Sequence, residues 1–138
     1  MDDNIRKQWV DKLRSGKYPQ GEGSLRKGEN FCCLGVLCEL AVEQGVIKSS
    51  YIAEGTRGIY VYADEKADDE YDAWLPPTVR KWAGLQTDEV KLSRARVVGK
   101  PGLMALSLTA MNDNGCTFEE IADFIESDDF EEAVDKSK

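Results

Sequence analysis

A glycine-rich segment near the start of the sequence carries the residues best suited to binding an anion. Residues 17–30 place Arg26 and Lys27 among glycines, and Tyr18 and Gln20 come earlier in the same segment. Glycine allows backbone N–H groups to approach a bound anion, and arginine offers a planar fork of donors for phosphate. The segment lacks the Gly-Lys-Ser/Thr ending of a nucleotide-binding P-loop and matches no dinucleotide fingerprint. A surface connector is the alternative interpretation.

A second polar segment, Asn112-Asp113-Asn114-Gly115, is typical of a turn. Asn and Asp tolerate the left-handed backbone region and bond their own backbone, so a structural turn is the default interpretation. The functional alternative is that Asn112 presents its amide to a ligand from the end of a helix.

The residue types that are missing restrict the possible chemistry. The sequence contains no histidine, which excludes serine or cysteine nucleophiles paired with imidazole, histidine-bearing zinc sites and histidine proton shuttles. The 26 acidic residues could supply an acid/base pair, but solvated surface carboxylates explain them better. Four cysteines, at 32, 33, 38 and 116, form no Cys-x-x-Cys pair. We expect buried thiols in a reducing cytoplasm, with no metal and no cofactor.

The charge distribution disfavours nucleic acid as a partner. The net charge is −8, and residues 113–138 carry ten acids against two lysines, so the first 112 residues are neutral overall. An acidic protein repels the phosphates that a duplex-binding protein must neutralise. The longest apolar run, residues 31–38, is far shorter than the ~18 residues of a membrane span, and no basic leader precedes it. We therefore expect a cytoplasmic protein without a membrane segment.

The length of 138 residues and the hydrophobic patterning predict a single α+β domain spanning residues 1–138, with helices around a small antiparallel sheet. Helices are expected over residues 2–15, 31–44, 76–84, 103–112 and from 117, with an acidic helical extension from about residue 128.

The remaining segments predict strands and loops. Residues 46–62 favour antiparallel strands, of which Ile59–Tyr62 is the clearest, and residues 85–102 suggest a second pair. Residues 17–28 read as a loop with short extended pieces, and the acidic stretch 63–72 as an exposed loop. Residues 108–125 also resemble the first half of a helix-turn-helix, but the acids that follow would repel DNA.

Four blocks of sequence together resemble the first class of Thoeris anti-defence sponges, a family of small phage proteins. They cover about a third of the chain and comprise Gly16–Arg26, Phe31–Leu40, Trp74–Gly84 and Met111–Ile125. The extension from 128 to 138 matches no motif of that family.

The resemblance implies a phage protein that is not an enzyme. Acting in the host cytoplasm, it would bind cyclic ADP-ribose signals, and in some members cyclic oligonucleotides, and hide them from an immune effector without cleaving them. It maps an arginine and an asparagine of the family's binding site onto Arg26 and Asn112, to which we add Gln20. Nanomolar sequestration needs about 12 kcal/mol, more than one arginine supplies, so we expect a pocket shared in a dimer or a multiple of dimers.

Two other functions stay open at this stage. The acidic C-terminal region could serve as a nucleic-acid mimic in a protein-binding inhibitor, because ten acids follow residue 112. The helix-turn-helix regulator ranks behind it.

Overall fold

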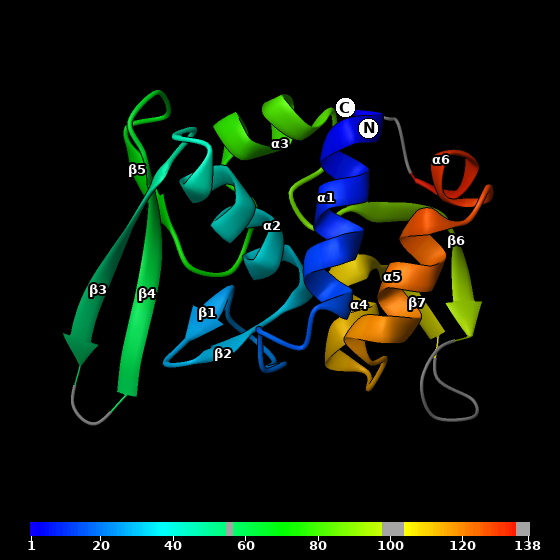
Figure 1. The fold of residues 1–138 in the computed structure, drawn as a ribbon, viewed down its shortest axis with the longest axis horizontal. Helices are drawn as coiled ribbons and strands as arrows, with labels where there is room; N and C mark the ends of the chain where they lie inside the picture. The colour runs from blue at the N-terminus through cyan, green and yellow to red at the C-terminus, as the bar shows by residue number, and fades with distance from the viewer. Residues whose placement is uncertain (55–56, 98–103, 135–138) are drawn as a thin grey trace.

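Two helices, α1 (Asp3–Arg14) and α2 (Cys33–Glu43), lie at the centre of the fold in the computed structural model, which describes residues 1–54, 57–97 and 104–134 (Figure 1). Asp2 caps α1 by accepting a hydrogen bond from the Ile5 N–H at 2.9 Å. The apolar residues that recur along this helix are buried, and the indole N–H of Trp9 donates to the Cys33 carbonyl oxygen at 2.9 Å. Nearly all of α2 is buried, as its uninterrupted apolar sequence predicts.

A five-stranded antiparallel sheet lies on one side of these helices. Its path runs β2-β1-β4-β3, with β5 also paired to β4. The strands are β1 (Arg26–Lys27), β2 (Asn30–Phe31), β3 (Lys48–Glu54), β4 (Arg57–Asp64) and β5 (Asp69–Tyr71). Predictions of strands within 46–62 and of short extended pieces in the early loop are confirmed.

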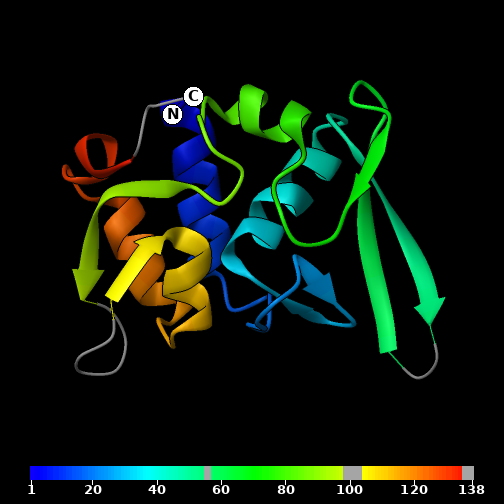
Figure 2. The same ribbon diagram turned by 180° about the vertical axis from the view of Figure 1, so that it is seen from behind.

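A second group of elements packs on the other side of α1 (Figure 2). It contains β6 (Lys91–Val97), β7 (Met104–Ser107), α4 (Leu108–Asp113), α5 (Phe118–Glu126) and α6 (Phe130–Ala133), while α3 (Pro77–Ala83) covers one end of the molecule. Helix α5 begins where the sequence predicts, with a capping box between Thr117 and Glu120. The expected α+β class, with helices around small antiparallel sheets, is confirmed.

The helix expected over 103–112 is shorter than predicted, because its first part is strand β7. Side chains of β7 alternate between exposed Met104 and Leu106 and buried Ala105 and Ser107, a strand pattern that an apolar run conceals. Ser107 then caps α4 by accepting from the Ala110 N–H at 3.0 Å. The second strand pair therefore joins 91–97 to 104–107 rather than lying within 85–102, and residues 98–103 fall outside the described part.

The acidic stretch 63–72 forms a hairpin instead of an open loop. Strand β4 continues to Asp64, and β5 returns with Tyr71 opposite Tyr62. Asp64 is buried, since its carboxylate accepts hydrogen bonds from the Thr78 N–H at 2.8 Å and the Thr78 hydroxyl at 2.6 Å. The other acids expected to be exposed, from Glu65 to Glu70, are exposed.

The acidic extension from about residue 128 packs against the rest of the chain up to Val134. Phe130 of α6 is fully buried and meets the Phe124 ring edge-on at 5.5 Å. Val134 forms a β-bridge with Leu92. Residues 135–138 lie outside the described part. No helix among the described residues is both long and apolar enough to cross a membrane.

Candidate functional site

Two of the three predicted site residues, Gln20 and Asn112, lie in direct contact. The Gln20 side-chain amide nitrogen donates to the Asn112 amide oxygen at 2.9 Å and to the Cys116 carbonyl oxygen at 2.7 Å. The Gln20 amide oxygen accepts from the Phe118 N–H at 3.2 Å. The early loop is thereby fixed to the turn between α4 and α5.

The amide of Asn112 is saturated by partners within the protein. Its nitrogen donates to the Gly21 carbonyl oxygen at 2.8 Å and to the Asp113 carboxylate at 3.3 Å. Its oxygen accepts from Gln20 and from the backbone N–H of Cys33 at 3.2 Å. An amide has two donor hydrogens and two acceptor lone pairs, so none is left over for a ligand. Asn112 is 1% exposed, which agrees with a role in positioning the loop.

Backbone hydrogen bonds hold the same loop against strand β2. The Gly21 N–H donates to the Phe31 carbonyl oxygen at 2.7 Å, and the Phe31 N–H donates to the Pro19 carbonyl oxygen at 2.8 Å. Leu25 donates to the Asp72 carbonyl oxygen at 2.7 Å, which joins the loop to the segment after β5. The glycine-rich segment is therefore anchored on both sides before it reaches Arg26.

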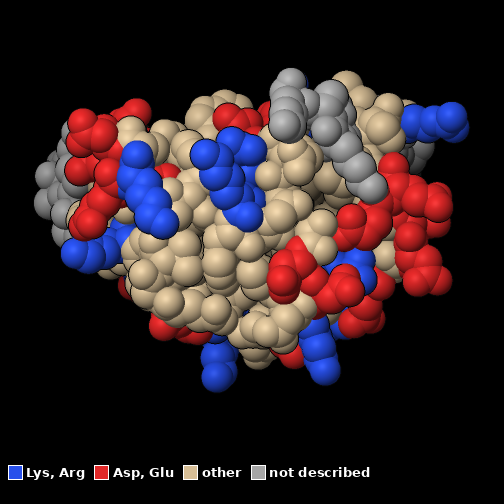
Figure 3. Space-filling view, turned by 90° about the horizontal axis from the view of Figure 1, so that it is seen from above, with Lys and Arg blue, Asp and Glu red and all other residues tan. Residues whose placement is uncertain are grey.

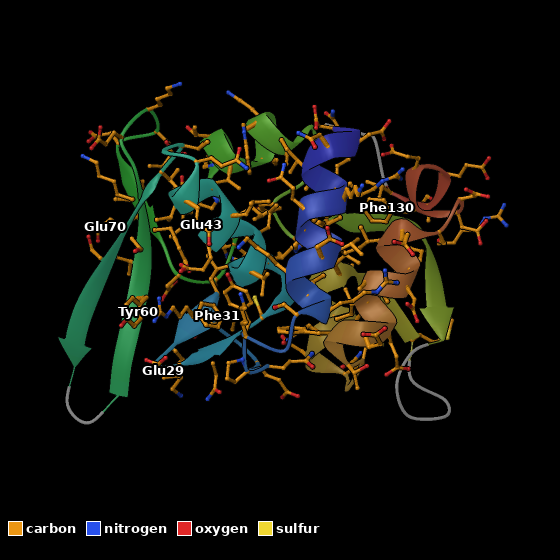
Figure 4. The ribbon with its side chains drawn as sticks, in the orientation of Figure 1. Glu29, Phe31, Glu43, Tyr60, Glu70 and Phe130 are labelled. Carbon is orange, nitrogen blue, oxygen red and sulfur yellow. The ribbon has the colours of Figure 1, made fainter. Side chains whose placement is uncertain are left out.

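The guanidinium of Arg26 lies between two aromatic rings. Its central carbon is 3.6 Å from the centroid of the Tyr60 ring and 4.8 Å from that of Phe31. Figure 4 labels Tyr60 on β4 and Phe31 on β2, and β1, which carries Arg26, lies between these two strands in the sheet. The Arg26 Nε–H donates to the Gly28 carbonyl oxygen at 3.0 Å, which fixes the plane of the guanidinium. Stacking of this kind holds an arginine in place without using its terminal donors.

Among the residues that the structure describes, the terminal nitrogens of Arg26 have two loose carboxylate partners. One lies 3.6 Å from Glu39 and the other 3.9 Å from Glu29, and both distances exceed those of a good N–H···O bond. Glu29 is 86% exposed, whereas Arg26 is 16% and Glu39 19% exposed. Another anion can therefore take the place of the exposed Glu29 carboxylate next to the terminal nitrogen of Arg26.

Glu39 is held from its other side by Tyr62. The Tyr62 hydroxyl donates to the Glu39 carboxylate at 2.7 Å. Burial, together with the nearby Cys38 and Glu39, raises the pKa of Tyr62 well above its usual value. The phenol consequently remains a donor near neutral pH and keeps Glu39 turned toward Arg26. We call Arg26, Phe31, Glu39, Tyr60 and Tyr62 the arginine cluster.

The three predicted residues do not converge on one point. Gln20 and Asn112 form the loop anchor, and Arg26 belongs to the arginine cluster. The two groups are linked through β2, because Phe31 pairs with Arg26 in the sheet and with Gln20 in an isolated bridge.

Sequence reasoning missed the partners of Arg26. The sequence predicts Tyr60 only as part of a strand and places Phe31 and Glu39 in one apolar helix, whereas the structure puts Phe31 in β2, before that helix begins. The pairing of Lys27 with Ile59 is what brings β1 beside β4. Only that register could have indicated the contact between Arg26 and Tyr60.

Cys32, Cys33 and Cys38 are buried, as expected, and so is Cys116. Burial raises the pKa of Cys32 to about 11 and also raises the pKa values of Cys33 and Cys38 well above the usual thiol value. Such thiols are poor nucleophiles near neutral pH. Within the described ranges no group of three or more Cys, Asp or Glu side chains is placed to hold a metal ion.

Comparison with known proteins places the chain in one family. Residues 1–129 match the family described as Domain of unknown function (DUF8296), and the chain belongs to that family. No curated protein and no solved structure matches it.

Proposed function

We propose that this protein of the DUF8296 family is a phage anti-defence protein that binds an anionic cyclic nucleotide of the cyclic ADP-ribose type and sequesters it unchanged. The observation that carries the proposal is the stacked guanidinium of Arg26, whose terminal nitrogens lie 3.6 and 3.9 Å from carboxylates. A phosphate that replaces Glu29 gains shorter, charge-assisted bonds to a donor that is already oriented. The resemblance to the Thoeris sponges, which also singled out Arg26, supports the same ligand class.

The arginine cluster supplies the two contacts that a nucleotide needs. The guanidinium fork matches a phosphate group, and a base can contact the exposed part of the half-buried Tyr60 ring, which lies against the guanidinium. Gln20 and Asn112 serve as positioning residues, since they hold the loop that delivers Arg26 to the rings.

The arginine cluster of a single chain offers too few favourable contacts for the nanomolar affinity that sequestration requires. Glu39 and Glu29 offset the charge of Arg26 and the neighbouring Lys27, so the surroundings of the guanidinium are neutral overall. A second protomer that contributes its own cluster would double the phosphate and stacking contacts. A dimer or a multiple of dimers, with ligand held between protomers, is therefore part of the proposal.

Isothermal titration calorimetry with cyclic ADP-ribose isomers and cyclic trinucleotides tests the proposal. The wild-type protein should bind at least one ligand with submicromolar affinity. Arg26→Ala should weaken binding by about 10- to 150-fold, the equivalent of 1.5–3 kcal/mol. Arg26→Lys keeps the charge but loses the fork and should also bind poorly.

Arg6→Ala is the matched control, because Arg6 is a partly exposed arginine on α1 that pairs with Asp3 and Glu131. It should bind like the wild-type protein. Absence of heat with every ligand at concentrations well above micromolar would overturn the proposal, as would equal affinities for Arg26→Ala and Arg6→Ala.

A protein-binding inhibitor is the second candidate, favoured by the acidic side chains that gather over α5 and α6 (Figure 3). Some of that charge is neutralised locally, because Arg14 contacts Asp123 at 2.6 Å and Glu126 at 2.9 Å. Deleting α5 would expose the core residues that its buried side chains cover, so substitutions that remove charge test the inhibitor function better than a truncation does. Capture of a basic protein that is lost in the triple variant Asp128→Asn, Asp129→Asn, Glu132→Gln would support this function over the first.

A further inference from the structure

A cavity of about 760 Å³ lies at the end of the molecule covered by α3, away from the arginine cluster. Its walls come from the turn after α2, the turn between β4 and β5, and one face of α3. This volume is in the range of pockets that hold small organic ligands. Nothing in the proposed function uses it.

The apolar part of the wall is suited to a flat ring. Val46, Ile47, Ala63 and Pro77 line the cavity together with the indole of Trp82. Trp82 is half-buried against the core, and its indole N–H has no hydrogen-bond partner among the described residues, unlike that of Trp9. Indole faces bind planar rings, and a free N–H seeks an acceptor.

The charged part of the wall leaves an excess of positive charge. Lys48, Lys66 and Lys81 line the cavity with two carboxylates, Asp64 and Glu65. Asp64 is occupied by its hydrogen bonds from Thr78 and Ala67, and Glu65 pairs with Lys48 at 3.2 Å. Lys66 and Lys81 form no ion pair within the part of the chain that the structure describes.

The surface view agrees with this distribution. Figure 3 looks onto this end of the molecule and shows blue side chains standing over a largely tan surface on its left half, with red side chains at the left edge. The acids Asp68, Asp69 and Glu70 line a neighbouring hollow on the β4–β5 turn. They are exposed, as are Lys66 and Lys81, so solvent and salt screen both sets of charges.

We propose that this cavity is a binding site for a small aromatic anion, a planar ring that carries a phosphate or carboxylate group. The ring packs against Trp82 and the apolar wall, and the anionic group lies between the ammonium groups of Lys66 and Lys81. The site is separate from Arg26, so its occupancy is independent of the cyclic nucleotide proposed above.

Calorimetry with 1-naphthyl phosphate tests the site, with inorganic phosphate and 1-naphthol as the separate halves of the probe. The aryl phosphate should bind at least tenfold more tightly than either half. The double variant Lys66→Gln, Lys81→Gln should weaken its binding at least tenfold, whereas Lys7→Gln, an exposed lysine on α1, should leave it unchanged. Thermal melts of each variant establish that the fold is retained.

The proposal would be overturned by an absence of binding to the wild-type protein at millimolar probe, or by equal affinity of the double variant and Lys7→Gln. Arg26→Ala separates this site from the proposed function, because it should keep the affinity for 1-naphthyl phosphate. Loss of probe binding in Arg26→Ala would place the probe at the arginine cluster and contradict a separate site.

Discussion

The side-chain amide of Gln20 donates a hydrogen bond to the side-chain amide of Asn112 at 2.9 Å, although 92 positions separate the two residues in sequence. This contact joins the glycine-rich loop to the turn between α4 and α5. Asn112 also holds the first turn of α2 through the Cys33 N–H. The two amides therefore lock three segments into the arrangement that presents Arg26.

Asn112→Asp should be strongly destabilising. The substitution removes both donor hydrogens, leaves the Gly21 carbonyl without its partner, and puts a buried negative charge beside Asp113. A buried group that loses its partner costs about 1–3 kcal/mol and a charge costs more, so we expect a loss of about 3 kcal/mol in the free energy of unfolding. Urea denaturation measures it.

Asn114→Asp is the control on the same turn, since the Asn114 side chain makes one long bond, 3.4 Å, to the Met104 carbonyl oxygen. It should change stability by about 0.5 kcal/mol or less. Equal effects of the two substitutions would show that the Asn112 network does not fix the loop.

Gly35→Ala should destabilise the protein although alanine favours helix. A Cβ on Gly35 would overlap the carbonyl oxygen of Leu25, where the early loop crosses α2. Alanine gains about 1 kcal/mol over glycine in an unobstructed helix, but overpacking costs about 1–3 kcal/mol. Denaturant midpoints should therefore fall in Gly35→Ala, and a rise would contradict the close approach. Ala41→Gly calibrates the value of one methyl group at a buried position of the same helix.

Asp64 should make stability depend on pH in the acidic range. Burial alone would raise the pKa of this carboxyl, but hydrogen bonds from Thr78, Ala67 and Lys66 outweigh it and lower the pKa. A lowered pKa in the folded state stabilises the protein above the unfolded value of about 4, and this stabilisation is lost as pH falls through the folded pKa.

Asp64→Asn should consequently be less stable than the wild-type protein at pH 7, with the gap closing as the pH falls below about 4. Thermal unfolding of both proteins across that range measures the difference. A gap that stays constant would mean that the Asp64 charge does not contribute.

The sequence predicted the helices whose ends are marked by capping residues, proline or glycine. Asp2 and Thr117 mark the starts of α1 and α5, and Pro77 and Gly84 bracket α3. The apolar residues within 103–112 fit the pattern of a helix as well as that of a strand. The strand ends and the helix begins at Ser107 because β7 pairs with β6, which the local sequence does not show. Local signals therefore predict an element's ends, while tertiary pairing decides ambiguous apolar runs.

The candidate site was predictable only in part for the same reason. Residue chemistry indicated Arg26 as a candidate, because arginine and glycine together suit an anion, with a surface connector as the alternative. The rings around it depend on strand register, and the saturation of Asn112 depends on contacts across more than 70 positions. The acidic composition of residues 63–72 predicted an exposed Asp64. In the structure Asp64 is buried because it accepts a hydrogen bond from the Thr78 N–H at the start of α3.

The proposed dimer, or multiple of dimers, rests on the affinity that sequestration would require. Multi-angle light scattering should give the mass of two chains of 15.4 kDa, or of a larger even number of chains. A mass of one chain at tens of micromolar, with and without cyclic nucleotide, would contradict a ligand held between protomers.

Mass spectrometry of the small molecules that heating releases from the purified protein tests the central claim most directly. The protein should be isolated from cells that produce the cyclic signal, as wild type and as Arg26→Ala. We predict that the wild-type protein releases an intact cyclic nucleotide and that Arg26→Ala releases little or none. Release of a linear hydrolysis product, of no nucleotide, or of equal amounts from both proteins would contradict sequestration at Arg26.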